Sequence, residues 1–202
     1  MFDEKSAAET LYASDRSSYP APGTARIELH YLPILHRGHA FLRLVRADGT
    51  TEELHGFSRS RDNGTINSMG VDGSRLVAEH SSDGPRLVDP TKEIGTIVEG
   101  AEGDIAKIWE RGKKAVVDIN ADKKTFDYKA HDPAYEFGGN GGQIQNSNSV
   151  TYTLGRAMGL DLDGVMKRAG VERKFSGWGR NLLDPKYDRY VAPSQLAVTQ
   201  TP

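Results

Sequence analysis

The sequence predicts an α+β fold, an antiparallel sheet of about four to six strands with a helix over residues 147–158 packed against it. Three observations lead to this prediction: a period-two alternation of apolar residues over 24–34, a hairpin pattern over 38–60, and one helical apolar stripe over 147–158. The chain's 202 residues suit a single domain, placed at 24–202. The preceding residues, 1–23, are polar and rich in Ser, Ala and Pro, which predicts a flexible arm.

The strands follow from alternation and turn residues. In TARIELHYLPI, Ile27, Leu29 and Tyr31 alternate with polar side chains, as in a strand with one buried face. The segment GHAFLRLVRADGTTEELHGFSRS reads as a hairpin that turns at Asp48-Gly49. The residues from 59 to 91 read as a long loop that holds one short strand, SRLVAEH. Two more short strands are expected at EIGTIVEGA and TFDYKA.

Three helices are expected from apolar residues at helical spacing. The first lies in GDIAKIWERGKKAV, where Gly112 is a residue at which the helix would end early. The second carries Val150, Leu154 and Met158 on one stripe and ends at Gly159. A short third helix follows in DLDGVMKRAG, and the aromatic tail from 175 onward is expected to pack back on the domain without regular structure.

Composition excludes several classes of function. The 26 basic and 28 acidic residues are spread along the chain, so nucleic acid is not an expected partner. The absence of cysteine removes disulfides, thiolate metal sites and thiol nucleophiles. No apolar run reaches the roughly 18 residues of a transmembrane segment, and the N-terminus lacks the pattern of a Sec signal. The expected location is therefore the cytoplasm, or outside the cell by a non-Sec route.

The stretch QIQNSNSV before the second helix allows two interpretations of Ser147. Asn and Ser are preferred helix caps, which is the structural interpretation. Alternatively, Ser147 is a nucleophile at a helix N-terminus, where free N–H groups and the helix dipole stabilise negative charge. Glycine pairs at 138–139 and 141–142 precede the stretch and would let a substrate approach closely.

A serine nucleophile needs a histidine base. With the turn at Asp48-Gly49, residues whose numbers sum to about 97 face each other, so His39 and His55 come within a few residue steps on adjacent strands. One imidazole would then be the base while the other fixes its tautomer; two surface histidines are the structural alternative. The remaining candidates, His30, His80 and His131, are expected at the surface. His36, His39 and His55 lack a nearby acidic pair, so neither a metal nor a cofactor is predicted.

These residues resemble a known family. GHAFLRLVRADGTTEELHG resembles the catalytic hairpin of NlpC-type papain-like hydrolases, in which two strands carry the two histidines of a Cys-His-His triad. The order His39, His55, Ser147 is similar to the permuted branch of that superfamily, which includes lecithin retinol acyltransferase-like proteins. NSNS stands where permuted members start the nucleophile helix with Asn-Cys, so Ser147 takes the place of the cysteine. The resemblance covers about residues 25–60 and 140–170 and implies a circularly permuted papain-like fold.

The chemistry that this resemblance implies is hydrolysis of an amide or ester bond. Ser147 would attack the carbonyl, His39 would move the proton and His55 would orient His39. The Ser147 N–H would stabilise the oxyanion, with side-chain donors among residues before or beside it: Gln143, Gln145, Asn146 and Asn148.

Family substrates are peptidoglycan peptides and lipid acyl groups, so the expected partners are a peptide, peptidoglycan or lipid substrate. For a bacterial effector or toxin, they would include a cognate immunity or delivery protein. The alternative is a catalytically inactive papain-like domain that acts as a binding module.

Overall fold

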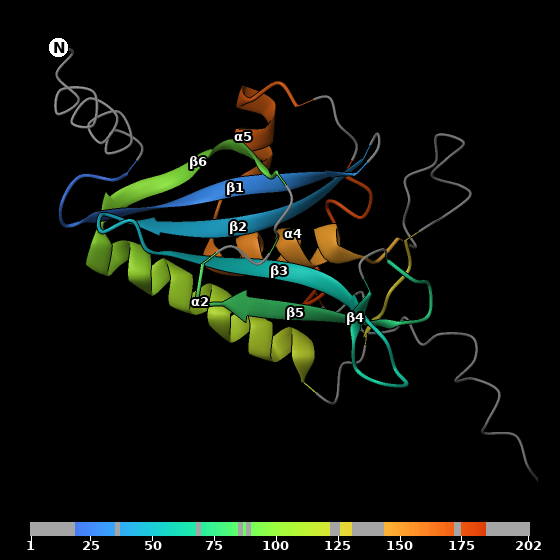
Figure 1. Cartoon of the computed structure of the whole chain (residues 1–202). Coiled ribbons are helices and arrows are strands. Elements are labelled where there is room, and N and C mark those ends of the chain that lie inside the picture. The colour runs from blue at the N-terminus through green and yellow to red at the C-terminus, as the bar shows by residue number, and fades with distance from the viewer. Residues whose placement is uncertain are drawn as a thin grey trace, which may run out of the picture.

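The structure, a computed structural model, describes residues 19–34, 37–67, 70–84, 87, 90–121, 126–130, 144–171 and 175–184. These ranges form an α+β fold, as predicted (Figure 1). Its sheet is antiparallel, with strand order β6-β1-β2-β3-β5-β7 and β4 paired to β3. The strands are β1 (Thr24–Ile34), β2 (Arg37–Arg46), β3 (Thr51–Arg59), β4 (Ile66–Asn67), β5 (Arg75–Ser81), β6 (Lys92–Ala101) and β7 (Phe126–Asp127). The helices are α2 (Glu102–Asn120), α4 (Ser147–Met158) and α5 (Leu162–Arg168).

The sheet of the described residues has seven strands rather than four to six. The excess comes from β4 and β7, which have two residues each. Segments of two residues are too short to show an alternation of apolar and polar residues. The sequence therefore shows no sign of β4, which lies in the predicted loop, and β7 covers only two residues of the strand expected at TFDYKA. The other five strands lie where the sequence predicted them, and α4 has the predicted bounds.

Helices α2 and α4 pack against each other and against the sheet (Figure 1). Helix α2 contacts β1, β5 and β6, whereas α4 contacts β2, β3 and β5. The buried core therefore comes from the alternate strand residues that face the helices and from the helical stripes. Its fully enclosed members include Ile27, Leu29, Leu42, Leu44, Leu54, Leu76, Ile105, Trp109 and Leu154.

The β2–β3 hairpin confirms the predicted turn. Gly49 adopts φ +84°, a left-handed conformation that L side chains rarely adopt. Leu42 pairs with Leu54 and Val45 with Thr51, so facing residues sum to 96 rather than about 97. The paired residues end at Leu42 and Leu54, so His39 and His55 lie just beyond the paired stretch.

Helix α2 does not end at Gly112 but runs on to Asn120. A Cβ at Gly112 would lie 2.7 Å from Met158 Sδ and 2.8 Å from Leu54 Cδ1. The glycine therefore lets α2 approach α4 and β3 closely, and this packing outweighs the roughly 1 kcal/mol that glycine costs in a helix.

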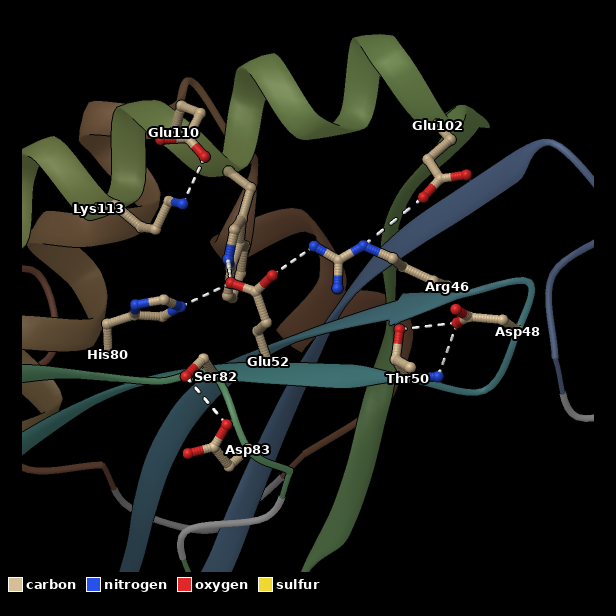
Figure 2. A network of polar contacts seen from close by, with 11 residues as sticks. Arg46, Asp48, Thr50, Glu52, His80, Ser82, Asp83, Glu102, Glu110 and Lys113 are labelled. Carbon is tan, nitrogen blue, oxygen red and sulfur yellow. Dashed lines mark hydrogen bonds and ion pairs between the residues drawn. The ribbon is translucent and has the colours of Figure 1, made fainter.

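A polar network joins α2 to the sheet through the Glu52 carboxylate (Figure 2). Oε2 accepts hydrogen bonds from Trp109 Nε1 on α2 at 2.8 Å and pairs with His80 Nε2 on β5 at 2.6 Å. Arg46 on β2 binds the other carboxylate oxygen. Burial alone would raise the pKa of Glu52, but the bonds from Arg46, His80 and Trp109 lower it to about 2.

Several sequence predictions fall on the ends of the chain. The predicted arm, 1–23, lies mostly outside the described residues, which begin at 19. In the tail, Phe175 and Leu182 are buried in the core without regular structure, as expected, and residues after 184 lie outside the described ranges. None of the helices in the described ranges is long and apolar enough to cross a lipid bilayer.

Candidate functional site

The start of α4 is closed by a capping box that does not use the Ser147 side chain. Asn146 is the N-cap, and its Oδ1 accepts the Asn148 N–H at 2.9 Å. The Ser149 hydroxyl accepts the Asn146 N–H at 3.2 Å and donates to the Gly177 carbonyl at 2.9 Å. Ser147 is thus the first helical residue, and its hydroxyl is not needed for the cap.

Asn148 ties this helix start to β2. Its Oδ1 accepts the Ala40 N–H at 2.8 Å, and its Nδ2 donates to the carbonyls of Gly38 and Ser176, each at 3.0 Å. Thr151 Oγ1, one turn on, donates to the Ala40 carbonyl at 2.8 Å. Because both amide hydrogens of Asn148 are engaged, this side chain has no donor left for an oxyanion. In the structure, Asn148 joins the start of α4 to β2 and to Ser176.

The pairing of β2 with β3 runs from Val45 and Thr51 to Leu42 and Leu54 and stops there. Beyond it, the backbone of Ala40 on β2 bonds to the side chains of Asn148 and Thr151 on α4 instead. Gly56, two residues beyond Leu54, lies against α4: a Cβ there would come within 2.6–2.8 Å of Val150 Cβ and the Ser147 backbone. The first turn of α4 therefore contacts both strands at the point where their mutual register ends.

A pocket of about 390 Å³ opens at this point. Its wall includes Gly38 and His39 from β2, Gly56 and Phe57 from β3, and Ser147 from α4. Apolar side chains line another part of the wall: Leu32, Ile34, Ile66 and Leu87. The structure thus brings His39 and Ser147, 108 positions apart in the chain, to one pocket. Within the described residues no hydrogen bond joins them, and His39 Nε2 is buried without a partner.

His39 lies in a row of aromatic rings. Its ring stacks on Phe57 and on His55, with centroids 5.6 and 5.8 Å apart. Burial, together with the neighbouring His55, lowers the pKa of His39 to about 3, so the imidazole is neutral at pH 7. Side chains alternate along a strand, so His39 points away from the face that carries Ala40.

His55 is fully buried and does not line the pocket. Its Nε2 lies 2.8 Å from Glu53 Oε2, and Arg43 donates to Glu53 Oε1 through Nε and Nη2 at 2.9 and 2.7 Å. Its Nδ1 has no partner. Neither nitrogen therefore bonds to His39, and the predicted tautomer-fixing hydrogen bond between the two rings is replaced by stacking at an interplanar angle of 17°.

Tyr128 is the site residue that sequence reasoning missed. It follows β7 and lines the pocket, and its hydroxyl interacts with both the hydroxyl and the backbone N–H of Ser147. Burial raises the pKa of Tyr128, against the opposing effect of these contacts. Its ring packs on Gly70, where a Cβ would lie 2.2 Å from the ring. A single tyrosine beside a two-residue strand gives no signal in the sequence, because only tertiary contacts bring it to α4.

Some of the remaining candidate residues lie within the described ranges and others lie outside them. Gln143 lies outside the described residues, as do His36 and His131. Gln145 Nε2 donates to the Asp127 carbonyl at 2.8 Å, whereas its Oε1 is buried without a partner. His80 is exposed, as predicted. His30 is only 5% exposed, so its prediction as a surface residue is wrong; Glu28 beside it provides a partner that allows burial.

Comparison with protein-family models, with curated proteins and with solved structures finds no match to this chain.

Proposed function

We propose that this protein is an acyl hydrolase of the permuted papain-like type, with Ser147 as nucleophile and His39 as base. The observation that carries the proposal is that both residues line one pocket of about 390 Å³. Ser147 is at the first position of α4, where the helix dipole favours developing negative charge. His39 is neutral, as a base must be, and its Nε2 is unpartnered.

In the proposed reaction, Ser147 Oγ attacks the substrate carbonyl while its proton passes to His39. The carbonyl electrons move to oxygen, and the Ser147 N–H, with Asn146 beside it, stabilises this oxyanion. His39 then protonates the leaving amine or alcohol as the tetrahedral intermediate collapses to an acyl-serine. Water, deprotonated by His39, attacks the acyl-serine. As this second tetrahedral intermediate collapses, His39 returns the proton to Ser147 Oγ and the acid leaves. His55 stacks on His39 and holds its ring in place. Glu53 binds His55, and Arg43 binds Glu53.

Apolar side chains line one part of the pocket, and polar ones such as Ser58, Asn67 and Ser147 line another. This lining suits a substrate with one apolar end and a carbonyl group. We propose peptidoglycan peptides and phospholipids as the two substrate classes, as for an effector that attacks the cell envelope. An effector of this kind would be held inactive in its own cell by a cognate immunity protein.

A fluorophosphonate probe tests the proposal, because it labels only an activated serine. We expect the protein to be labelled and Ser147→Ala to remain unlabelled. Ser176→Ala, which changes another serine of the pocket wall, is the matched control and should keep its label. Both variants should then be compared with the unchanged protein on peptidoglycan fragments and phospholipid vesicles by mass spectrometry. Labelling that is equal in Ser147→Ala, or absent in the unchanged protein, would overturn the proposal.

One observation favours a second candidate function, a binding module. A general base works best when its pKa is near the working pH, and a pKa of about 3 makes His39 a weak base. The Tyr128 hydroxyl also occupies the neighbourhood of the Ser147 N–H, where an oxyanion would bind. In this function the same pocket holds a carbonyl-bearing ligand without cleaving it. The probe result separates the two functions, because a binding module is not labelled.

A further inference from the structure

A group of potential metal ligands lies on β1 and β6, away from the pocket. One donor atom from each of Glu28, His30 and Glu93 lies within 4.8 Å of the other two. Glu28 and His30 are 3% and 5% exposed, whereas Glu93 is exposed to solvent. The group therefore combines two rigid, buried members with one that solvent can reach.

An irregularity in the β1–β6 pairing brings Glu93 to this position. Leu29 pairs with Gly95, but the next residue, His30, pairs with Glu93 rather than with Ile94. A regular ladder would place the apolar Ile94 opposite His30. Bulges of this kind re-aim a side chain, and they occur often at functional sites. Here the shift replaces an apolar neighbour of the Glu28–His30 pair by a carboxylate.

The hydrogen bonds of the group leave one buried ring nitrogen without a partner. Glu28 Oε2 lies 2.6 Å from His30 Nε2, and Arg26 Nε donates to Glu28 Oε1. His30 Nδ1 is buried without a partner. Glu93 brings a second carboxylate close to the first, and no hydrogen bond or ion pair of Glu93 is found within the described residues.

We propose that Glu28, His30 and Glu93 bind one divalent transition-metal ion of the zinc class. Imidazole and carboxylate groups together suit Zn²⁺, and three protein ligands leave a coordination position open to water. Arg26, which pairs with Glu28, would orient the Glu28 carboxylate from outside the coordination sphere. The bound ion would link strand β6 to β1. The site is separate from the pocket of Ser147 and does not depend on the proposed function.

Titration calorimetry of the full chain with ZnCl₂ tests this site. We expect one ion per chain, and we expect Glu93→Gln to weaken binding at least about tenfold, since even outer-sphere partners change metal affinity about 10–100-fold. Glu93 is exposed, so this substitution should not disturb the fold. Glu99→Gln changes another exposed glutamate of the same strand and should bind Zn²⁺ as the unchanged protein does.

Equal Zn²⁺ affinity in Glu93→Gln and Glu99→Gln would overturn the proposal, as would the absence of binding to the unchanged protein. A second measurement follows the buried ligand by NMR. Zn²⁺ should shift or broaden the ring signals of His30 in the unchanged protein and leave them in place in Glu93→Gln. Signals of His30 that stay unchanged while Zn²⁺ binds would place the ion elsewhere and overturn the proposal.

Discussion

The imidazole rings of His39 and His55 lie nearly parallel, with centroids 5.8 Å apart and an interplanar angle of 17°. A hydrogen bond between two imidazoles requires a ring nitrogen of one to point at a ring nitrogen of the other in its plane, and stacked rings do not provide this. His55 is instead held by Glu53, which Arg43 binds in turn. His39 is thus positioned by packing between rings, and its side chain is half-buried. Burial together with His55 lowers its pKa.

The low pKa of His39 predicts a loss of stability in acid. Its pKa is about 3 in the folded protein against an ordinary value of 6.5, so the unfolded chain binds the proton more tightly. The stability contributed by this neutral histidine is complete above pH 6.5 and is lost as the pH falls toward 3. NMR titration of the histidine ring signals should show His39 neutral down to about pH 4. A ring of His39 that titrates near pH 6 would contradict the prediction.

Tyr128→Phe should make Ser147 more accessible to a fluorophosphonate. The substitution keeps the ring that packs on Gly70 and removes the hydroxyl that interacts with the Ser147 N–H and hydroxyl. Without that hydroxyl, the N–H is free to bind the probe's oxygen, so we expect faster labelling with little change in melting temperature. Slower labelling would show that the tyrosine hydroxyl assists the reaction instead of competing with it.

Asn148→Ala should lower the free energy of unfolding by about 3 kcal/mol, because a buried polar group that loses its partner costs about 1–3 kcal/mol. Three backbone groups would lose their bonds: the Ala40 N–H and the carbonyls of Gly38 and Ser176. Denaturant unfolding measures this change. Asn63→Ala, which alters an exposed turn, should cost less than about 0.5 kcal/mol. A similar small cost at Asn148 would show that the helix start is not held by these bonds.

Two glycines of α2 should respond in opposite directions to alanine. Gly112→Ala places a methyl group within 2.8 Å of Met158 and Leu54, so we expect a loss of about 1–3 kcal/mol from overpacking. Gly103→Ala meets nothing within 4 Å and should stabilise the protein by about 0.5–1 kcal/mol through helix propensity. Thermal unfolding of the two variants checks both signs, and a stabilised Gly112→Ala would mean that α2 lies farther from α4.

Glu52→Gln should weaken the link between α2 and the sheet, shown in Figure 2. The pKa of Glu52 is lowered to about 2 from an ordinary 4.5, so its contribution is present above pH 4.5 and is lost as the pH falls toward 2. Since the carboxylate is only partly buried, we expect a cost of about 1 kcal/mol at pH 7. The cost should vanish near pH 2, as measured by denaturant unfolding at both pH values. A cost that persists there would assign the effect to packing.

The sequence by itself determined the elements that repeat a pattern over many residues. The alternation in β1, the Asp48-Gly49 turn between β2 and β3, and the stripe of α4 each depend on local periodicity or on a backbone conformation that few residues adopt. The hairpin register was predicted to within one residue, so the closeness of His39 and His55 followed from the chain alone.

Only the tertiary structure decided what lies around those residues. It extended α2 through Gly112, buried His30, engaged Asn148 in backbone bonds and brought Tyr128 to Ser147. Each of these depends on contacts between segments far apart in sequence, where burial and close packing outweigh local preference. A polar side chain has the same letter whether it caps a helix, bonds a distant strand or lines a pocket, and only its neighbours in space distinguish these roles.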